Sequence, residues 1–344
     1  MNVYSFKFDI DWKLINRLSQ IDRFDASWTS IEKKEGLSLK QLKSIATIRS
    51  VGASTRIEGS QMSDEEVDVL LRNISIDKLV DRDSQEVAGY FDVLDQISSS
   101  YEHIRITESE LKGFHNQLLR YSQKDAWHKG DYKQHSNNVV ATHQDGSTQI
   151  VFQTTPPGYE TEDAMRKLID WYLKDTEIHP IVKSAVFSYE FVSIHPFQDG
   201  NGRLSRLIAS LLLLKSGYTW IQYVSFEHEI ENKKSEYYRQ LRICQAQRPN
   251  ENITTWIEYF LDALINIQQQ LLSKLLQVGV HSDLSHKEKS VVAYISNYPG
   301  SKSGAIARNL EMPNPTVKKI LKRLTEKNVI EKQGVGRGTS YSIN

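Results

Sequence analysis

The chain has 344 residues, enough for two or three domains with an ample core. Its 43 basic and 43 acidic side chains give a formal net charge of zero, so no global field selects a partner. The single cysteine, Cys244, excludes an internal disulfide and a cysteine-based zinc site. The first residues lack a signal peptide's basic and apolar regions, and the longest apolar run, 207–214, is too short for a membrane span. We therefore expect a cytoplasmic protein that does not enter the membrane.

Residues 1–45 mix aromatic and charged side chains, which predicts short extended and helical pieces that form an N-terminal cap. From residue 38 the apolar side chains recur at helical spacing (Leu39, Leu42, Ile45, Ile48), and this helix should end near Glu58. A carboxylate in the last turn of a helix is unfavourable unless a cation holds it. Glu58 is thus interpreted either as an exposed residue near the helix end or as an ion-pair partner.

Residues 80–125 predict further helices, with His115 on an apolar face, where we interpret it as a packing histidine. His128, His135 and His143 lack the spacing of metal ligands. From residue 139 the pattern changes to two β-rich runs around Asp145-Gly146, which predicts a hairpin over 139–157. By itself this could be a surface hairpin without a role.

Two amphipathic helices are predicted at 161–175 and 180–194, and the second leads directly into residues 195–206, HPFQDGNGRLSR. A Gly-Asn-Gly turn before an apolar helical run places free backbone N–H groups and the positive end of the helix dipole at one point, which favours an anion. Arg203 and Arg206 share one face of that helix and can bind phosphate oxygens. Asp199 is a hard oxygen ligand suited to Mg²⁺, and His195 can accept a proton at neutral pH. The stretch predicts phosphoryl or nucleotidyl transfer.

The composition changes after residue 278. Residues 285–344 contain eleven Lys and Arg, four Glu and no Asp, a net charge of +7. Three predicted helices and two short strands around a glycine-rich turn follow the order of a winged helix-turn-helix, with residues 316–328 as its recognition helix. A basic third helix suits DNA phosphates, but a protein-interaction or dimerisation module fits the same pattern.

The stretch 195–206 resembles the Fic family signature, HxFx[D/E]GNGRxxR, at every fixed position. The resemblance implies a mainly α fold: a Fic helical core at 81–278 with a β-hairpin flap, a cap at 1–80 that carries an inhibitory helix, and the small C-terminal winged-helix (α+β) domain at 279–344. It also implies an AMP transferase that uses ATP and Mg²⁺ to modify a Ser, Thr or Tyr hydroxyl of a target protein. The target would pair with the flap, whose residues Val151, Phe152, Gln153 and Thr154 would lie over the nucleotide.

The signature residues take their roles from the same resemblance. His195 would be the general base, Asp199 would hold Mg²⁺, and Arg203 and Arg206 would bind phosphates. The remaining residues expected at the nucleotide are Gly200, Asn201, Gly202, Leu204, Ser205 and, from a Tyr-Tyr-x-x-Leu segment beside the adenine, Tyr238. Ser54 to Gly59 resembles the family's inhibitory motif, [S/T]xxxE[G/N], whose glutamate, here Glu58, would pair with Arg206 in place of the γ-phosphate.

One segment departs from the family pattern. Gly130-Asp131-Tyr132-Lys133 resembles the G-x-Y-R segment that leads into the flap, with Lys133 where the family has arginine. Three alternatives stay open: AMP removal by the same fold, transfer of another phosphate-containing group, and a DNA-binding regulator with a nucleotide-sensing Fic core. Besides a target protein and DNA, a second copy of the chain is a candidate partner.

Overall fold

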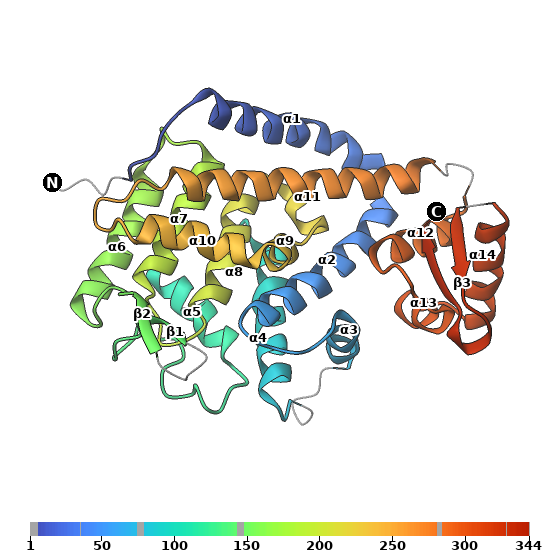
Figure 1. Ribbon diagram of the computed structural model, residues 1–344, viewed down its shortest axis with the longest axis horizontal. Helices are drawn as coiled ribbons and strands as arrows, with labels where there is room; N and C mark the ends of the chain where they lie inside the picture. Colours follow the sequence, from blue (N-terminus) through green and yellow to red (C-terminus); the bar gives the residue numbers. More distant parts are fainter. Residues whose placement is uncertain are drawn as a thin grey trace.

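The computed structural model describes residues 6–34, 36–73, 79–142, 148–280, 284–327 and 329–343, and this part of the chain is mainly helical (Figure 1). The helices are α1 (Trp12–Lys34), α2 (Gly36–Ile57), α3 (Asp64–Arg72), α4 (Arg82–Ser100), α5 (Glu108–Leu118), α6 (Tyr159–Lys174), α7 (Pro180–Ile194), α8 (Asn201–Lys215), α9 (Phe226–Asn232), α10 (Lys234–Gln245), α11 (Thr254–Val280), α12 (His286–Asn297), α13 (Ser303–Asn309) and α14 (Asn314–Glu326). The strands are β1 (Val139–Thr142), β2 (Thr148–Phe152), β3 (Ile330–Gln333) and β4 (Ser340–Ile343). Short 3₁₀ turns lie at Thr219–Tyr223 and Gly336–Gly338.

The core that positions the site is built around α7 and α8, which pack against each other. Nearly every side chain of both helices is buried; α7 was predicted to be amphipathic, but its polar side chains Ser184, Ser188 and Glu190 are buried with the apolar ones. A single hydrophobic cluster joins them to α1, α2, α4, α5, α6, α10 and α11. The loop between α7 and α8 carries His195 and Asp199, so the surrounding helices hold both ends of that loop.

The N-terminal region differs from the expected short pieces, because α1 is a continuous helix of 23 residues. Ile21, Phe24 and Trp28 are buried, and their spacing of three and four residues forms one helical face. This face lies against α11, and Figure 1 shows the two long helices running side by side. The charged residues between these positions obscured the stripe in the sequence.

The C-terminal module has its own hydrophobic cluster, formed by α12, α13, α14 and the antiparallel strands β3 and β4. The order of three helices and two strands agrees with the prediction, although the expected recognition helix ends at Asn328, which lies outside the described residues. The module packs against α2 and α11 at one end of the molecule (Figure 1). Arg49 of α2 donates to the carbonyl of Asn297 and lies over the Tyr298 ring, 5.1 Å from its centre. Arg72 of α3 donates to the carbonyl of Asn309 at 2.9 Å.

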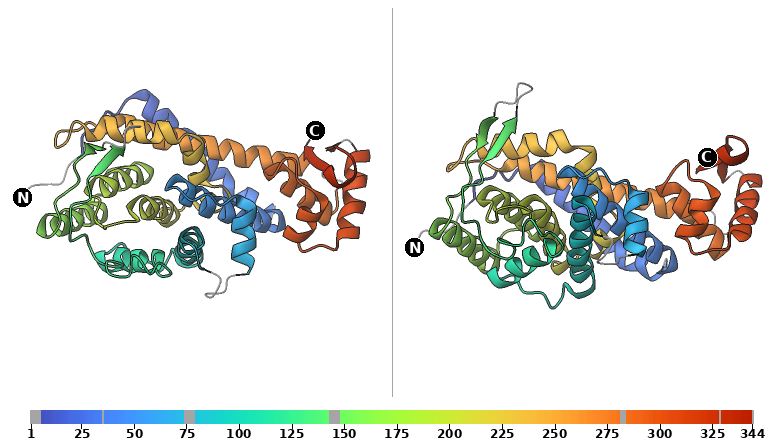
Figure 2. Two further views of the ribbon diagram at one scale, coloured as in Figure 1. Left: turned by 60° about the horizontal axis from the view of Figure 1, so that its bottom comes forward. Right: turned by 90° about the horizontal axis from the view of Figure 1, so that it is seen from below.

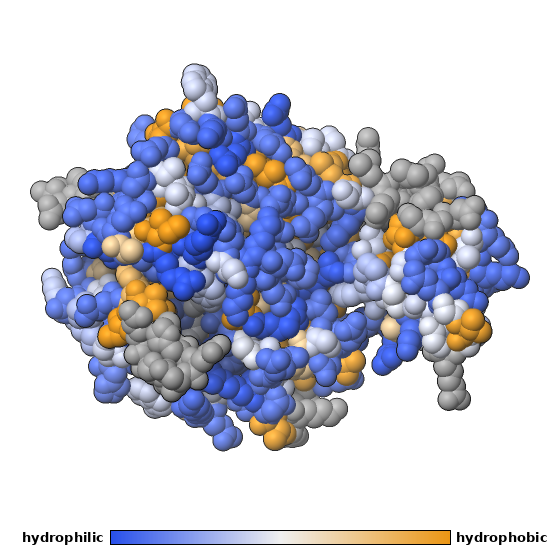
Figure 3. All heavy atoms as spheres, viewed as in Figure 1, coloured by the Kyte–Doolittle hydropathy of each residue, from blue (hydrophilic) through white to orange (hydrophobic). Residues whose placement is uncertain are grey.

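The predicted hairpin is present: β1 and β2 pair in antiparallel register, with Val139 opposite Phe152 and Thr142 opposite Thr148. Its turn, 143–147, lies outside the described residues. Figure 2 shows the strands standing out from the helical body. The face drawn in Figure 3 is mostly hydrophilic, with hydrophobic residues in small separate groups. Among the described helices, none is long and apolar enough to cross a membrane.

Candidate active site

His195 ends α7 in the left-handed conformation, with φ of 55°. Its backbone N–H donates to the carbonyl of Phe191 at 3.0 Å, and its Nδ1 lies 3.2 Å from the carbonyl of Val192. A proton on Nδ1 satisfies this bond and leaves Nε2 as the free acceptor. Burial, followed by the positive charge of Lys133, lowers the pKa of His195 to about 4. The imidazole is therefore neutral at pH 7, in the form that accepts a proton.

The N-terminus of α8 follows at Gly200, which has φ of 78° and accepts the N–H of Leu204 at 2.9 Å. Asn201 is buried and fixes the loop, because its Oδ1 accepts the N–H of Phe197 at 2.9 Å and its Nδ2 donates to the same residue's carbonyl at 2.7 Å. Gly200 has a left-handed backbone, whereas Gly202 lies within α8 and has helical geometry. The carboxylate of Glu58 lies directly over Gly202, so a Cβ there would displace this side chain.

Asp199 lies between two guanidinium groups and the helix N-terminus. Its Oδ1 accepts the N–H of Gly200 at 2.6 Å, and its carboxylate lies 3.6 Å from Arg203 and 3.3 Å from Arg82. Burial opposes ionisation, but Arg203, the Gly200 N–H and Arg82 together lower the pKa of Asp199. The carboxylate is ionised at pH 7 and its side chain is 40% exposed.

Asp199 can hold Mg²⁺ only if other ligands complete the coordination of the ion. Among the described residues no three His, Cys, Asp or Glu side chains come together as metal ligands. A single exposed carboxylate is suited to an ion that keeps most of its waters and takes further oxygens from phosphates. Asp199 would hold such an ion only together with a nucleotide.

Arg203 is 1% exposed and forms an ion pair with Glu86 of α4, 3.1 Å away. Its Nε is buried and has no hydrogen-bond partner among the described residues. A buried donor without a partner costs free energy, which an anionic oxygen at this position would recover. Glu86 was not identified from the sequence, since it lies on another helix and no motif links it to the signature.

Arg206 is held by the end of α2. Its Nε donates to Ser54 Oγ at 2.8 Å, and its Nη2 donates to the carbonyl of Ser54 at 3.0 Å and to Glu58 Oε1 at 2.8 Å. Burial opposes the charge, but Glu58 and the nearby tyrosines raise the pKa of Arg206 above its usual value. Glu58 thereby places its carboxylate at the N-terminus of α8, the position expected to attract phosphate.

Further expected site residues lie around this centre at different depths. Tyr238 is near Glu58 and Arg206, and burial followed by the charge of Glu58 raises its phenol pKa. On the hairpin, Phe152 and Thr154 are buried, whereas Val151 and Gln153 are exposed. The side chains of Leu204 and Ser205 point into the core, where Ser205 Oγ donates to the carbonyl of Ser188 at 3.2 Å.

His115 was interpreted from the sequence as a packing histidine, and it is fully buried. Its ring stacks on Phe197 with 3.9 Å between ring centres, and its Nε2 lies 3.0 Å from the carbonyl of Asp199. Its Nδ1 accepts the N–H of Gly130 at 2.9 Å. Burial lowers the pKa of His115 to about 4, so it supports the loop between α7 and α8 as a neutral ring. Its apolar spacing predicted burial but not these contacts.

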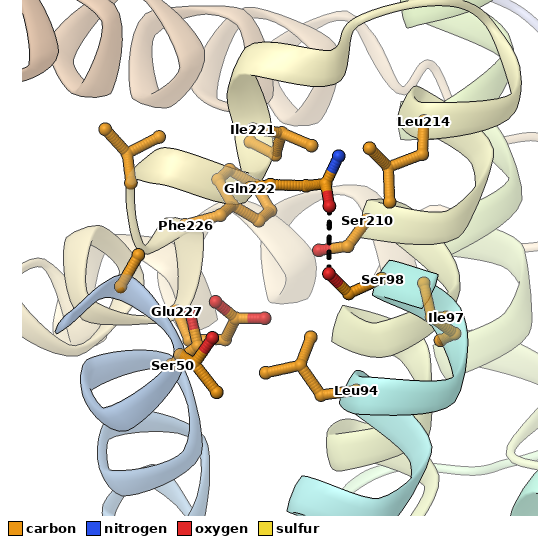
Figure 4. Close-up of a pocket in the computed structure, with 13 residues that line it drawn as sticks. Ser50, Leu94, Ile97, Ser98, Ser210, Leu214, Ile221, Gln222, Phe226 and Glu227 are labelled. Carbon is orange, nitrogen blue, oxygen red and sulfur yellow. Dashed lines mark hydrogen bonds between the residues drawn. The ribbon is translucent and has the colours of Figure 1, made fainter. Parts of the chain in front are cut away.

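A small cavity beside α2 is distinct from this centre. Figure 4 shows Ser50, Leu94, Ser210, Phe226 and Glu227 around it, and Ser98 Oγ donates to Gln222 Oε1 across one end at 2.8 Å. Its volume of about 30 Å³ is that of a water molecule. Ligand pockets are about 300–1,000 Å³, so this cavity excludes a nucleotide.

Comparisons with known proteins agree with the geometry. Residues 105–213 match the family model described as Fic/DOC family. The chain is 27% identical over 208 residues to Protein adenylyltransferase Fic of Drosophila willistoni, and 46% identical over 76 residues to the protein of that name from Nematostella vectensis. These matches cover 59% and 21% of this chain but only 39% and 18% of the relatives.

The fold comparison extends over the whole chain. A Fic family protein from Desulfovibrio desulfuricans G20 superposes with a TM-score of 0.66 over 99% of this chain and 98% of its own, at 24% identity. The C-terminal module is included in this match. At this identity the likeness concerns the fold alone.

Proposed function

The chain carries a Fic domain at residues 105–213, and we propose that it is a protein adenylyltransferase that moves AMP from ATP to a Ser, Thr or Tyr hydroxyl of a target protein. The observation that carries this proposal is the meeting of His195, with Nε2 free, and the N-terminus of α8 with its two arginines. A proton acceptor beside an anion site suits attack by a hydroxyl on a phosphate. The relatives' name, adenylyltransferase, supports the choice of AMP.

In the proposed reaction the target oxygen forms a bond to the α-phosphorus while the bond between that phosphorus and the bridging oxygen breaks, releasing pyrophosphate. The hydroxyl proton passes to Nε2 of His195. The backbone N–H groups at Gly200–Gly202 and the guanidinium of Arg203 would bind the phosphates. Mg²⁺, held by Asp199 and the nucleotide, would neutralise the charge of the phosphate oxygens. The exposed strands of the hairpin would align the target segment by strand addition.

We further propose that Glu58 restrains this activity. Its carboxylate and a γ-phosphate would compete for Arg206, since one guanidinium cannot satisfy both. A restraint that leaves about 1% of the molecules competent corresponds to roughly 2.7 kcal/mol. One partly buried ion pair and the packing of α2 can supply that amount.

The test compares wild type, Glu58→Gly and Glu58→Gly with His195→Ala, incubated with α-labelled ATP and Mg²⁺. Glu102→Gly is the matched control, because it removes an exposed carboxylate just after the end of α4. We expect label on the protein or on lysate proteins only with Glu58→Gly, and its loss when His195 is also replaced. Equal labelling by wild type and Glu58→Gly would contradict the restraint.

AMP removal is the alternative within the same fold, and it inverts the role of Glu58. A hydrolase would use this carboxylate to orient a water molecule, so wild type would strip AMP from modified proteins and Glu58→Gly would not. If Glu58→Gly transfers no AMP and wild type removes AMP from modified proteins, the proposed reaction is hydrolysis and not transfer.

A second proposal concerns the C-terminal module, which we propose binds duplex DNA. Lys318, Lys319 and Lys322 of α14 are exposed, and the module's charge of +7 favours phosphates. Replacing Lys318 and Lys319 by Gln should weaken binding to a duplex and reduce its salt dependence by about one ion per lost contact. Duplex binding that is unchanged by replacing Lys318 and Lys319, or a wild-type protein that does not bind the duplex at low salt, would favour a protein-interaction module.

A further inference from the structure

Lys133 is a buried cation between the hairpin and the catalytic loop. Its side chain is 2% exposed, and its Nζ donates to Asn137 Oδ1 at 2.9 Å, Thr154 Oγ1 at 3.0 Å and the carbonyl of Ile194 at 3.1 Å. Burial lowers its pKa to about 8, with no carboxylate of the described residues offsetting the effect. An ammonium group is retained in such a place only when its donors are satisfied, and here three donors meet three acceptors.

The three acceptors belong to three separate segments. Asn137 precedes β1, Thr154 follows β2, and Ile194 is the last residue of α7. The backbone of Lys133 adds a fourth connection, since its N–H donates to the carbonyl of Pro196 at 2.8 Å. One residue therefore joins both ends of the hairpin to the segment that contains His195.

Asn137 extends this connection to the backbone of the catalytic histidine. Its Nδ2 donates to the carbonyl of His195 at 3.3 Å and to that of Phe197 at 2.6 Å. Thr154 Oγ1 donates to Asn137 Oδ1 at 2.9 Å, so the acceptors of Lys133 are also bonded to each other. His195 has a left-handed backbone that costs a non-glycine residue free energy and persists only where surrounding contacts fix it.

We propose that Lys133 is a positioning residue that fastens the base of the β1–β2 hairpin to the loop of His195. This inference rests on the proposed function. The hairpin is the part expected to hold the target, and His195 is the group expected to take its proton. A fixed distance between them would keep the hydroxyl within reach of Nε2, and a misplacement of about 1 Å is enough to lower a rate by about 100-fold.

The chemistry at this position requires a charged donor with several N–H groups. Methionine has a similar volume but would leave the three oxygens without their shared donor. Arginine keeps the charge and supplies five donors, although its planar group reaches them with a different geometry. Lys133→Met should therefore release the loop, and Lys133→Arg should retain most of the connection.

The experiment measures self-labelling with α-labelled ATP in the Glu58→Gly protein, alone and with Lys133→Met, Lys133→Arg or the exposed control Lys124→Met. We expect Lys133→Met to lower the maximum rate by about 10- to 100-fold while the ATP concentration at half-maximal rate changes less than about threefold. Lys133→Arg should recover most of the rate, and Lys124→Met should have no effect. A folded Lys133→Met protein with the parent's rate would overturn the proposal.

Two further measurements test the role of Lys133 if Lys133→Met does not fold or if the parent protein transfers no AMP. If Lys133→Met does not fold, Asn137→Ala is the second test, because it removes the hydrogen bonds from Asn137 to the carbonyls of His195 and Phe197. It should lower the same rate, and an unchanged rate would overturn the proposal. Amide hydrogen exchange at residues 195–201 should accelerate in Lys133→Met but not in Lys124→Met, and this needs no activity. If the parent protein transfers no AMP, the proposed function fails, and exchange alone decides the role of Lys133: acceleration supports it and unchanged exchange overturns it.

Discussion

The buried guanidinium of Arg203 depends on a carboxylate from a different helix. Replacing Glu86 by Ala would leave this charge with Asp199 alone, 3.6 Å away. Breaking a buried pair on one side costs about 3–5 kcal/mol, because the remaining charge stays desolvated. We expect Glu86→Ala to lower the free energy of unfolding by about 3 kcal/mol in urea titrations, and Glu102→Ala, at an exposed site, by less than about 0.5 kcal/mol. A loss below about 1 kcal/mol would show that the pair contributes little.

The two buried histidines predict how stability depends on pH. Burial lowers the pKa of both His115 and His195 to about 4, below the unfolded value of 6.5. Below pH 6.5 the unfolded chain binds protons that the folded chain does not, so the free energy of unfolding falls as pH falls from 6.5 towards 4. The slope approaches about 1.4 kcal/mol per pH unit for each histidine.

Urea midpoints between pH 7 and pH 4.5 test this sign. His195→Asn should flatten the dependence by one histidine, whereas His103→Asn, at an exposed position, should not. The other charges facing His195 are Lys133, Glu58 and Asp199, of which Lys133 opposes its protonation and the two carboxylates favour it. A dependence equally steep with and without His195 would assign the slope to other groups.

The site residues that could be identified from the sequence are those that lie close together along the chain. His195, Asp199 and the two arginines fall within twelve positions, so their shared chemistry was visible before any fold was known. Glu86, the loop contacts of His115 and the role of Lys133 were missed, because these contacts join α4, α5 and the segment before β1 to α8 and to the loop that precedes it. The contact of Glu58 with Arg206 was expected only through the family resemblance, as a charge pair between distant positions leaves no local pattern.

At the scale of elements, periodicity predicted the helices whose apolar faces are wide. α6 and α7 lie where expected, because apolar residues recur through the whole length of both segments. α1 was missed as one helix, since most of its surface is charged and only a narrow face is buried. Such a helix owes its stability to the neighbour that covers this face, here α11, and not to its own sequence.

This explanation of α1 predicts a contrast between two isoleucines of the same helix. Ile21 is fully buried and Ile15 is 42% exposed. Ile21→Ala should lower the free energy of unfolding by about 2–5 kcal/mol through lost burial and a cavity, and Ile15→Ala by about 0.5 kcal/mol or less. Equal losses in urea titrations would mean that helix propensity, which the two substitutions change alike, governs α1.

At the scale of the whole molecule, the C-terminal module joins the helical body through α12, which packs against α2 and α11, and through polar contacts from α2 and α3. A cavity of about 630 Å³ lies between it and α2, α3 and α4, lined by both charged and apolar residues. The polar connections bridge this space at its edges, through Arg49 to Asn297 and Arg72 to Asn309. Interfaces of this kind allow domains to move relative to each other unless specific contacts prevent it. The relative position of the module therefore depends on the packing of α12 and on the arginine contacts from α2 and α3.

Arg49→Ala combined with Arg72→Ala should loosen the module without unfolding the helical body. The variant loses the carbonyl contacts and the stacking of Arg49 on Tyr298, whereas the cluster around α7 and α8 keeps all its packing. We expect amide exchange in α12 to accelerate by about tenfold, equivalent to about 1.4 kcal/mol of local opening, while α7 stays unchanged. Arg105→Ala, which removes an exposed arginine, is the control. Acceleration in α7 as well would mean that the two hydrophobic clusters unfold together, and the module would then be part of a single cooperative unit.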